Sequence, residues 1–501
     1  MTAGARSSNS HLLALIVPPR SGYNASMRSI GQLLRARAAC VLLLPALLAA
    51  GCSPAPPAAN LPAPVPPSAP PAASAPTATV APSATPAPLA TAAPSATPAP
   101  SATPAPTLIP TPTLAPLSEE VRARVFDQAW RLVRDRYVYP DYRGVNWRAV
   151  RDELRPRALA ADTPEAFYDV MHELIDRLGD DHSRFASPQE AAEDDRQYEG
   201  ELEYGGIGAI IRDVPEGGLI VRLARGGPAA EAGLRPRDIV VRVNGLPFAD
   251  PAFGPEGALS VVRGAPGGQV RLTVRSPDGA EREVSLTRRA ISSNDYPNVT
   301  AERLPGTNVG LVMIATFYAD GLADEARDAV THLAAAGPLA GLILDVRGND
   351  GGSIQAMLDT LALFLDGGTI GSSHGRHGTN RLNVPAGRTL PALRGVPLVV
   401  LTDSETVSAA EMFAAGLQAR GRGRVVGEPS AGNVENLVIH TLEDGSQLWL
   451  AEYAFRLPDG TLLEGRGVQP DRVVRAEWWR YGPADDPQVR AAQEELPRVA
   501  T

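Results

Sequence analysis

The sequence contains no lysine, because all 47 of its basic residues are arginines. Any mechanism that needs a lysine amine is therefore excluded, including Schiff bases, lysine-dependent phosphate loops and Ser/Lys catalytic dyads. Acidic residues number 56, and the formal net charge is −9. This acidic balance argues against nucleic acid as a partner.

Cysteine is almost absent, with only Cys40 and Cys52 in the chain. Both lie within residues 1–52, which carry five arginines and no acidic residue. The apolar run 41–50 is too short to span a membrane comfortably, and it leads into Leu-Ala-Ala-Gly-Cys at 48–52. This pattern predicts a secretory signal peptide, and its ending resembles a bacterial lipobox with Cys52 as the lipidated residue. A plain signal peptide with an incidental cysteine is the alternative.

Removal of the signal would leave Cys52 as the sole cysteine, which excludes an internal disulfide and a zinc site built on thiolates. We expect no cofactor and no metal. Residues 53–117 consist mainly of Pro, Ala, Thr and Ser without charge, which predicts a disordered tether. Together these segments predict an exported, membrane-anchored lipoprotein of the bacterial cell envelope.

Beyond the tether the composition changes several times. Residues 118–198 place apolar side chains at helical spacing, which predicts an N-terminal helical region. Residues 199–290 show short apolar runs between glycine turns, which predicts a small β domain. Residues 291–480 alternate apolar strands with helical patterns, as in an α/β core with buried strands. Residues 481–501 are expected to form a C-terminal tail.

Two segments of the α/β core could carry chemistry. Residues 344–352 predict a strand that ends in a glycine turn and opens a helix, where free N–H groups could form an oxyanion hole. A tight structural turn is the alternative there. Ser408 follows another strand and lies at or near the first turn of a helix, where the helix dipole favours an alkoxide. Serine is also a favoured N-cap, so that a purely structural role is the competing interpretation.

The ordered motifs resemble the C-terminal processing peptidases and the related tricorn-core proteases, which are serine peptidases on a crotonase-like α/β core. The resemblance covers residues 118–475, and residues 199–290 resemble a PDZ domain of the bacterial protease type. The motifs that carry it are GPAAEAGL at 227–234, RDIVVRVNG at 237–245, LDVRGNDGG at 344–352, ETVSAAEMFAAGLQ at 405–418, RVVGEPSAGN at 424–433 and LPDGTLLEGRGVQPD at 457–471.

The resemblance implies a role for particular residues. Ser408 matches the family nucleophile, whereas the lysine base of the processing-peptidase branch is replaced by Asn433. His182 matches the histidine base of the tricorn-like branch, and Glu464 matches its glutamate. Asp181 stands where that branch has a serine, and either acid could orient the ring.

Backbone N–H groups complete the implied sites. Those of Gly351 or Gly352 and of Ala409 would hold the oxyanion. In the PDZ-like domain, the amides of the loop Gly206-Ile207-Gly208 would bind the C-terminal carboxylate of a peptide.

The resemblance therefore implies an α/β multidomain fold and an exported serine endopeptidase that recognises protein C-termini. His374 and His377 compete with His182 as the base. An inactive relative that binds peptides or small lipophilic molecules is the alternative function.

Overall fold

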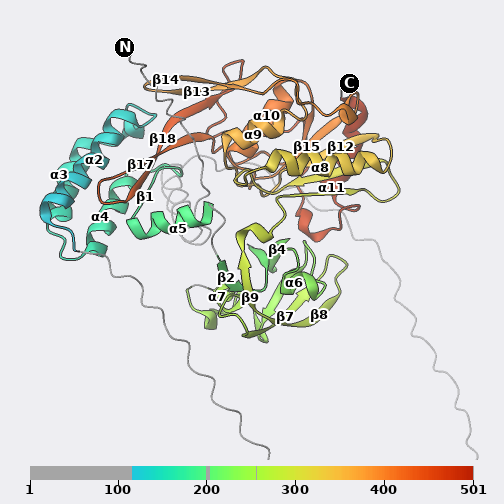
Figure 1. Ribbon diagram of the computed structural model, residues 1–501, viewed down its shortest axis with the longest axis horizontal. Helices are drawn as coiled ribbons and strands as arrows, with labels where there is room; N and C mark the ends of the chain where they lie inside the picture. The colour runs from blue at the N-terminus through green and yellow to red at the C-terminus, as the bar shows by residue number, and fades with distance from the viewer. Residues whose placement is uncertain (1–115, 199–202, 256, 500–501) are drawn as a thin grey trace, which may run out of the picture. The chain divides into compact units, whose positions relative to one another are not determined.

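The computed structural model describes residues 116–198, 203–255 and 257–499 (Figure 1). The predicted signal peptide, Cys52 and nearly all of the predicted tether lie outside these residues. Within the described ranges, no helix is both long and apolar enough to cross a membrane. The predicted mixture of helices and sheets is confirmed.

The N-terminal region is helical, as predicted, and also contributes one short strand. Ser118 begins the first helix, since its Oγ accepts the N–H of Val121 at 3.4 Å. Thr163 caps a later helix in the same way through the N–H of Ala166. The elements are α2 (Glu119–Arg136), α3 (Trp147–Leu159), α4 (Pro164–Asp176), β1 (Arg184–Ala186) and α5 (Pro188–Tyr198).

The PDZ-like domain is built from antiparallel strands. Its main sheet has the order β3-β4-β5-β7-β8, so that β3 lies at an edge among the described strands. β2 pairs with β9 in a separate ribbon, and β6 pairs with β5. The elements are β2 (Glu203–Gly206), β3 (Ala209–Val214), β4 (Gly217–Leu223), α6 (Pro228–Glu231), β5 (Ile239–Val243), β6 (Leu246–Pro247), α7 (Gly257–Val262), β7 (Gln269–Arg275), β8 (Glu281–Thr287) and β9 (Arg289–Ser292).

The α/β core contains a sheet with the order β10-β11-β12-β15-β16-β19, in which only β10 runs antiparallel to its neighbour. Helices follow its strands in the alternation that the sequence predicts. The elements are β10 (Val299–Arg303), β11 (Val309–Ile314), α8 (Leu322–Ala335), β12 (Gly341–Asp345), α9 (Ile354–Leu361), β15 (Leu398–Thr402), α10 (Ala409–Ala419), β16 (Arg424–Gly427), β19 (Arg472–Val473) and α11 (Pro487–Glu495). Short 3-10 helices occur at Tyr142–Gly144, Pro251–Phe253, Ser293–Asp295, Pro391–Leu393, Trp478–Arg480 and Leu496–Arg498.

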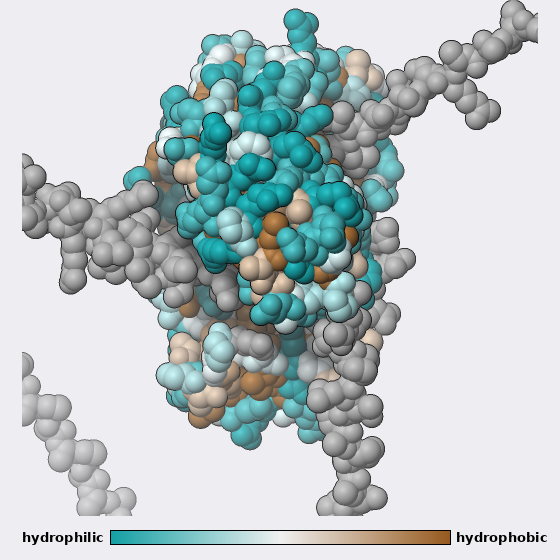
Figure 2. Space-filling model, turned by 90° about the vertical axis from the view of Figure 1, so that its left-hand side faces the viewer, coloured by the Kyte–Doolittle hydropathy of each residue, from teal (hydrophilic) through white to brown (hydrophobic). Residues whose placement is uncertain are grey.

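Both faces of this sheet are covered, which explains why its central strands are apolar throughout. In β12, Leu342 and Leu344 pack in the core cluster formed with α8, α9 and α10. Ile343 points to the opposite face, where it packs in a cluster with Val489 and Ala492 of α11. The face of the molecule seen in Figure 2 is, by contrast, mainly hydrophilic.

The prediction of a C-terminal tail over residues 481–501 is wrong for most of that range. Residues 487–495 form α11, whose buried side chains cover the second face of the sheet. Its apolar positions are few and lie among charged residues, so that the sequence pattern alone did not predict a packed helix.

A second, antiparallel sheet joins the N-terminal region to the core. Its order is β1-β18-β13-β14, and β17 also pairs with β18. Phe185 of β1 lies opposite Leu448 of β18, and the N–H of Val138 donates to the carbonyl of Ala451 at 2.9 Å. The N-terminal region and the core therefore share one sheet. Its remaining strands are β13 (Thr369–Gly375), β14 (Gly378–Asn383), β17 (Glu435–Thr441) and β18 (Gln447–Arg456).

A buried ionic network connects the PDZ-like domain with the core. Asp486, which precedes α11, accepts from Arg237 of the PDZ-like domain at 3.3 Å and from Arg347 of the core at 2.9 Å. Arg347 also pairs with Asp345 at 2.6 Å. Both guanidinium groups lie over the ring of Trp478, at 5.2 Å and 4.7 Å from its centroid. The carboxylate of Asp486 thus pairs with two buried cations from different parts of the chain, and Asp345 supplies the second negative charge.

Replacement of Asp486 by alanine should destabilise the protein strongly. Two buried arginines would lose a partner, and breaking such a buried pair costs about 3–5 kcal/mol. We expect a clear fall in the urea midpoint of unfolding, measured by tryptophan fluorescence. Asp485→Ala is the matched control, because its exposed pair with Arg490 should contribute no more than about 1 kcal/mol. Equal effects of the two substitutions would contradict the role of the network.

Candidate active site

Ser408 lies between β15 and α10, at the N-terminus of the helix. Its backbone adopts a conformation that is rare for residues other than glycine. Its φ is 62° and its ψ is −119°. Such strain in a non-glycine residue persists only where the surroundings impose it, and it concentrates at functional sites. The side chain is fully buried, and its Oγ has no hydrogen-bond partner among the described residues.

The buried carboxylate of Glu411 holds the backbone around Ser408. It accepts the N–H of Ser408 at 2.9 Å, one turn back along the chain. It also accepts the hydroxyl of Ser430 at 2.5 Å and the N–H groups of Gly432 at 2.7 Å and Asn433 at 2.9 Å. Burial raises the pKa of Glu411, whereas these four donors oppose that shift. Glu411 therefore ties the serine turn to the loop 430–433.

The glycine turn predicted at residues 344–352 lies directly against Ser408. A Cβ on Gly351 would come within 2.8 Å of the Cβ of Ser408, and its φ is +94°, so that only glycine fits without strain. The N–H of Gly351 donates to Asn349 Oδ1 at 2.9 Å. The N–H groups of Gly352 and Ala409, by contrast, have no acceptor in the part of the chain that the structure describes. Of the predicted oxyanion donors, these two are free.

His182 lies in the turn before β1 and is almost fully buried. The carboxylate of Asp180 shapes this turn by accepting the N–H groups of His182 at 3.1 Å and Ser183 at 2.6 Å. The hydroxyl of Ser183 in turn accepts the N–H of Ala451 in β18 at 3.1 Å. The pairing of β1 with β18 therefore carries the histidine to the core.

Two carboxylates lie beside the ring of His182. Its Nε2 is 3.5 Å from Oε1 of Glu464, one of the two predicted orienting acids, and 3.5 Å from Oε2 of Glu435, an acid that the sequence motifs did not indicate. Asp181, the other predicted orienting acid, has an exposed side chain.

The electrostatics of this cluster favour a protonated histidine. Burial lowers the pKa of His182, but the nearby carboxylates of Glu464 and Glu435 outweigh that effect and raise the pKa above its ordinary value. Burial also raises the pKa of Glu435 to about 7, while the charge of His182 opposes that shift. Two titratable groups with raised pKa values lie next to each other.

The structure does not join the histidine to the serine directly. Nε2 of His182 and Oγ of Ser408 both lack hydrogen-bond partners among the described residues. The connection runs instead through the loop that Glu411 holds, since the N–H of Val434 donates to Glu464 at 2.9 Å. Glu435 follows Val434 and begins β17.

The competing histidines lie elsewhere. His374 is an exposed residue of β13, where Ser372 lies 2.8 Å from its Nε2 and Thr379 lies 3.2 Å from its Nδ1. His377 is also exposed, and its Nε2 lies 2.9 Å from the carbonyl of Asp135. Neither has a contact with Ser408 among the described hydrogen bonds.

In the PDZ-like domain, Gly206 ends β2, and Ile207 and Gly208 connect it to the edge strand β3. The carbonyl groups of Ile207 and Gly208 accept the N–H groups of Ala229 at 2.8 Å and Ala224 at 2.9 Å. The N–H groups of Ile207 and Gly208 have no acceptor within the described ranges, although both residues are buried. The loop therefore offers free amides next to an open strand edge.

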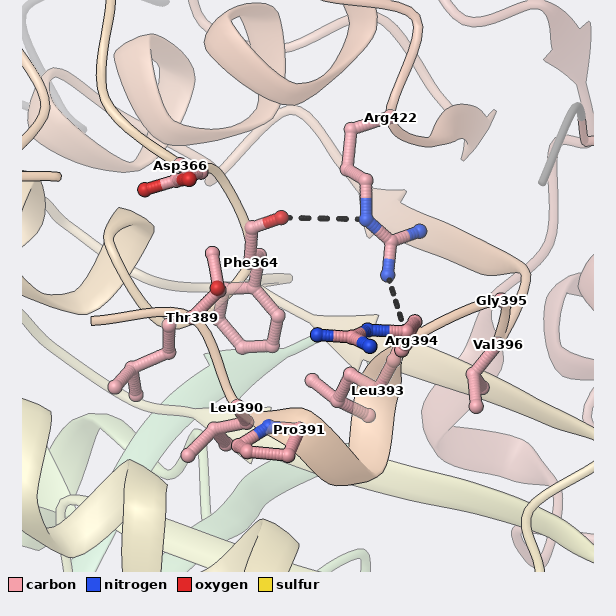
Figure 3. Close-up of a pocket in the computed structure, with 11 residues that line it drawn as sticks. Phe364, Asp366, Thr389, Leu390, Pro391, Leu393, Arg394, Gly395, Val396 and Arg422 are labelled. Atoms are coloured by element: carbon pink, nitrogen blue, oxygen red, sulfur yellow. Dashed lines mark hydrogen bonds between the residues drawn. The ribbon is translucent and has the colours of Figure 1, made fainter. Parts of the chain in front are cut away.

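The pocket in Figure 3 contains none of the predicted site residues. Arg422 spans it, and donates to the carbonyls of Phe364 at 3.2 Å and Leu393 at 3.3 Å. These hydrogen bonds hold the Arg422 side chain across the pocket. It is lined by Leu363, Phe364, Asp366, Thr389, Leu390, Pro391, Leu393, Arg394, Gly395, Val396 and Arg422.

Comparison with known families gives three matches along the chain. The tricorn protease C1 domain matches residues 118–176, the PDZ domain matches residues 219–276, and peptidase family S41 matches residues 308–474. They follow one another in the order that the sequence motifs predict.

Individual relatives agree with these matches. A carboxyl-terminal-processing protease of Picosynechococcus is 30% identical over 375 residues, which cover 74% of this chain and 88% of that protein. CtpA of Bacillus subtilis, a carboxy-terminal processing protease, is 29% identical over 305 residues, or 61% of this chain and 62% of that protein. The solved structure of a photosystem II D1 C-terminal processing protease is 26% identical, with a TM-score of 0.50, and covers 76% of this chain and 99% of that one.

These findings confirm the predicted family, fold class and PDZ domain, and they support a serine peptidase. The chain belongs to the carboxyl-terminal-processing proteases of peptidase family S41.

Proposed function

We propose that the protein is an exported serine endopeptidase in which a histidine replaces the lysine base of its relatives. Ser408 is the nucleophile, and the observation that carries this proposal is its strained backbone together with an unpartnered, buried Oγ. A serine hydroxyl needs a base to become nucleophilic, and a chain without lysine cannot supply a neutral lysine amine for this purpose.

His182 is the proposed base. It accepts the proton of Ser408 Oγ as that oxygen attacks the scissile carbonyl, and it then donates the proton to the leaving amine. Glu464 and Glu435 stabilise the imidazolium that forms between these steps. The step requires the ring and Ser408 Oγ to come within hydrogen-bond distance, and catalytic hydrogen bonds often tighten only when substrate is bound.

The N–H groups of Gly352 and Ala409 stabilise the oxyanion. Both lack an acceptor among the described residues, and Ala409 also begins α10, whose positive end favours negative charge. Gly351 contributes by its lack of a side chain, which allows the turn to approach Ser408. Water then hydrolyses the acyl-enzyme.

The PDZ domain recruits the C-terminal residues of protein substrates. A peptide would add to the edge of β3 while its carboxylate accepts the N–H groups of Ile207 and Gly208. Export and lipid attachment at Cys52 remain predictions from the sequence of residues 1–52, and they would place the peptidase at the membrane of the cell envelope.

Ser408→Ala should abolish peptide hydrolysis and labelling by a fluorophosphonate probe, because both require the serine oxygen. His182→Ala should lower kcat by roughly a thousandfold or more, as losses of a catalytic base do. The control is His374→Ala, which removes an exposed histidine and should leave kcat unchanged. Full activity of the His182 variant would exclude it as the base.

The pH dependence of kcat/KM tests the electrostatics of the base. His182 must be neutral to accept a proton, so that activity should rise with pH through its raised pKa, above the ordinary value of about 6.5. Glu435→Gln removes a negative charge beside the ring and disfavours the imidazolium, which should shift the acid limb to lower pH by roughly one unit. Glu190→Gln, beside the remote His172, should leave the profile unchanged. A shift to higher pH in the Glu435 variant would contradict the assignment.

A further inference from the structure

The cluster of His182, Glu435 and Glu464 holds more unsatisfied polar atoms than a structural ion pair does. Nε2 of His182 and both carboxylate oxygens of Glu435 are buried without a hydrogen-bond partner among the described residues. His182 is 7% exposed and Glu435 is fully buried. Buried polar atoms are normally paired, and their exceptions indicate a missing partner.

The distances within the cluster are wrong for hydrogen bonds but suit a metal ion. Nε2 lies 3.5 Å from one oxygen of each glutamate, beyond the usual 2.7–3.2 Å range of such bonds. Zinc binds nitrogen and oxygen at about 2.0–2.2 Å, and a tetrahedron with these bonds separates its ligands by about 3.4 Å. An octahedron with the same bonds would separate adjacent ligands by only about 3.0 Å. All three ligand atoms lie within 4.8 Å of one another.

The charge of the cluster also fits a dication. A metal ion displaces the protons that these groups otherwise hold, and the neutral imidazole and two carboxylates that remain carry a charge of −2, which one divalent ion balances. Arg143 also interacts electrostatically with Glu435, but its side chain is exposed and lies over the ring of Tyr139 at 5.8 Å. An imidazole nitrogen favours zinc over magnesium or calcium, which prefer oxygen ligands alone.

We propose that His182, Glu435 and Glu464 form a binding site for one Zn²⁺ ion, with a water molecule as the fourth ligand. The ion binds Nε2 of His182 and one oxygen of each glutamate. Val434, whose N–H donates to the second oxygen of Glu464, fixes the orientation of that carboxylate. No thiolate takes part, so that the absence of cysteine from the folded region is no obstacle.

The consequence for catalysis is inhibition, and this part rests on the proposed function. An imidazole whose nitrogen coordinates zinc and whose position is fixed by two carboxylates cannot move a proton to and from Ser408. Removal of the ion would release the base. The site would therefore make peptidase activity depend on the concentration of free zinc.

Metal uptake should be measured on the full-length Ser408→Ala protein, purified without a histidine tag, by calorimetric titration with zinc chloride. We expect one equivalent of zinc to bind. Glu435→Gln and Glu464→Gln, each added to this background, should weaken the affinity by roughly tenfold or more. His440→Gln is the matched control, because His440 also faces a carboxylate, that of Glu452 at 2.6 Å, and should leave the affinity unchanged.

Cobalt(II) provides a second measurement that does not depend on the variants folding. Co²⁺ in a four-coordinate site absorbs visible light strongly, whereas Co²⁺ in a six-coordinate site absorbs weakly. We expect strong absorption that zinc abolishes. No uptake of either metal, or equal affinity in the Glu435→Gln protein, would overturn the site.

Activity measurements separate this proposal from the proposed function. Zinc should inhibit peptide hydrolysis by the unsubstituted protein, and EDTA should restore it. If zinc binds at this site without inhibiting, the metal site stands and His182 is not the base. If no zinc binds but His182→Ala is inactive, the base stands and the metal site is wrong.

Discussion

The arrangement of the site depends on one buried carboxylate, that of Glu411. It accepts four hydrogen bonds, from Ser408, Ser430, Gly432 and Asn433. A buried anion keeps its charge only when donors surround it, so that this acceptor holds each of these groups in place. The hydrogen bond from the N–H of Ser408 to Glu411 maintains the positive φ of Ser408. The hydrogen bonds from the loop 430–433 to Glu411 determine where β17 begins.

The hydrogen bonds between Glu411 and the loop 430–433 also connect the candidate nucleophile with the candidate base. Three consecutive residues make this connection. The N–H of Asn433 donates to Glu411, the N–H of Val434 donates to Glu464, and Glu435 is the first residue of β17. Both glutamates then face His182, which arrives from the N-terminal region by the pairing of β1 with β18. A core strand thus serves as the common support for two segments that are far apart in the sequence. The entropic cost of closing such a long loop grows only slowly with its length, and the shared apolar core offsets it.

Arginine side chains, the only strongly basic side chains in this lysine-free sequence, gather around Trp478. Three guanidinium groups lie over its ring, those of Arg212 and Arg237 from the PDZ domain and that of Arg347 from the core. Planar guanidinium groups stack on aromatic rings and bind carboxylates with two nitrogens, which an ammonium group cannot do. Arg237 has a φ of 76°, in the left-handed region that favours glycine. Its ion pair with Asp486 compensates for that strain and connects the domain to the turn before Gly351.

The sequence by itself determined the family, the order of the domains and the absence of a Ser/Lys dyad, because these follow from motifs and composition. It also predicted the buried strands of the core, since a strand covered on both faces must be apolar throughout. Only the tertiary structure decided that residues 487–495 form a packed helix, that Glu435 joins Glu464 at His182, and that the side chain of Asp181 is exposed. The physical reason is that burial, side-chain direction and the distances between charges arise from contacts between distant segments, which no local pattern of residues encodes.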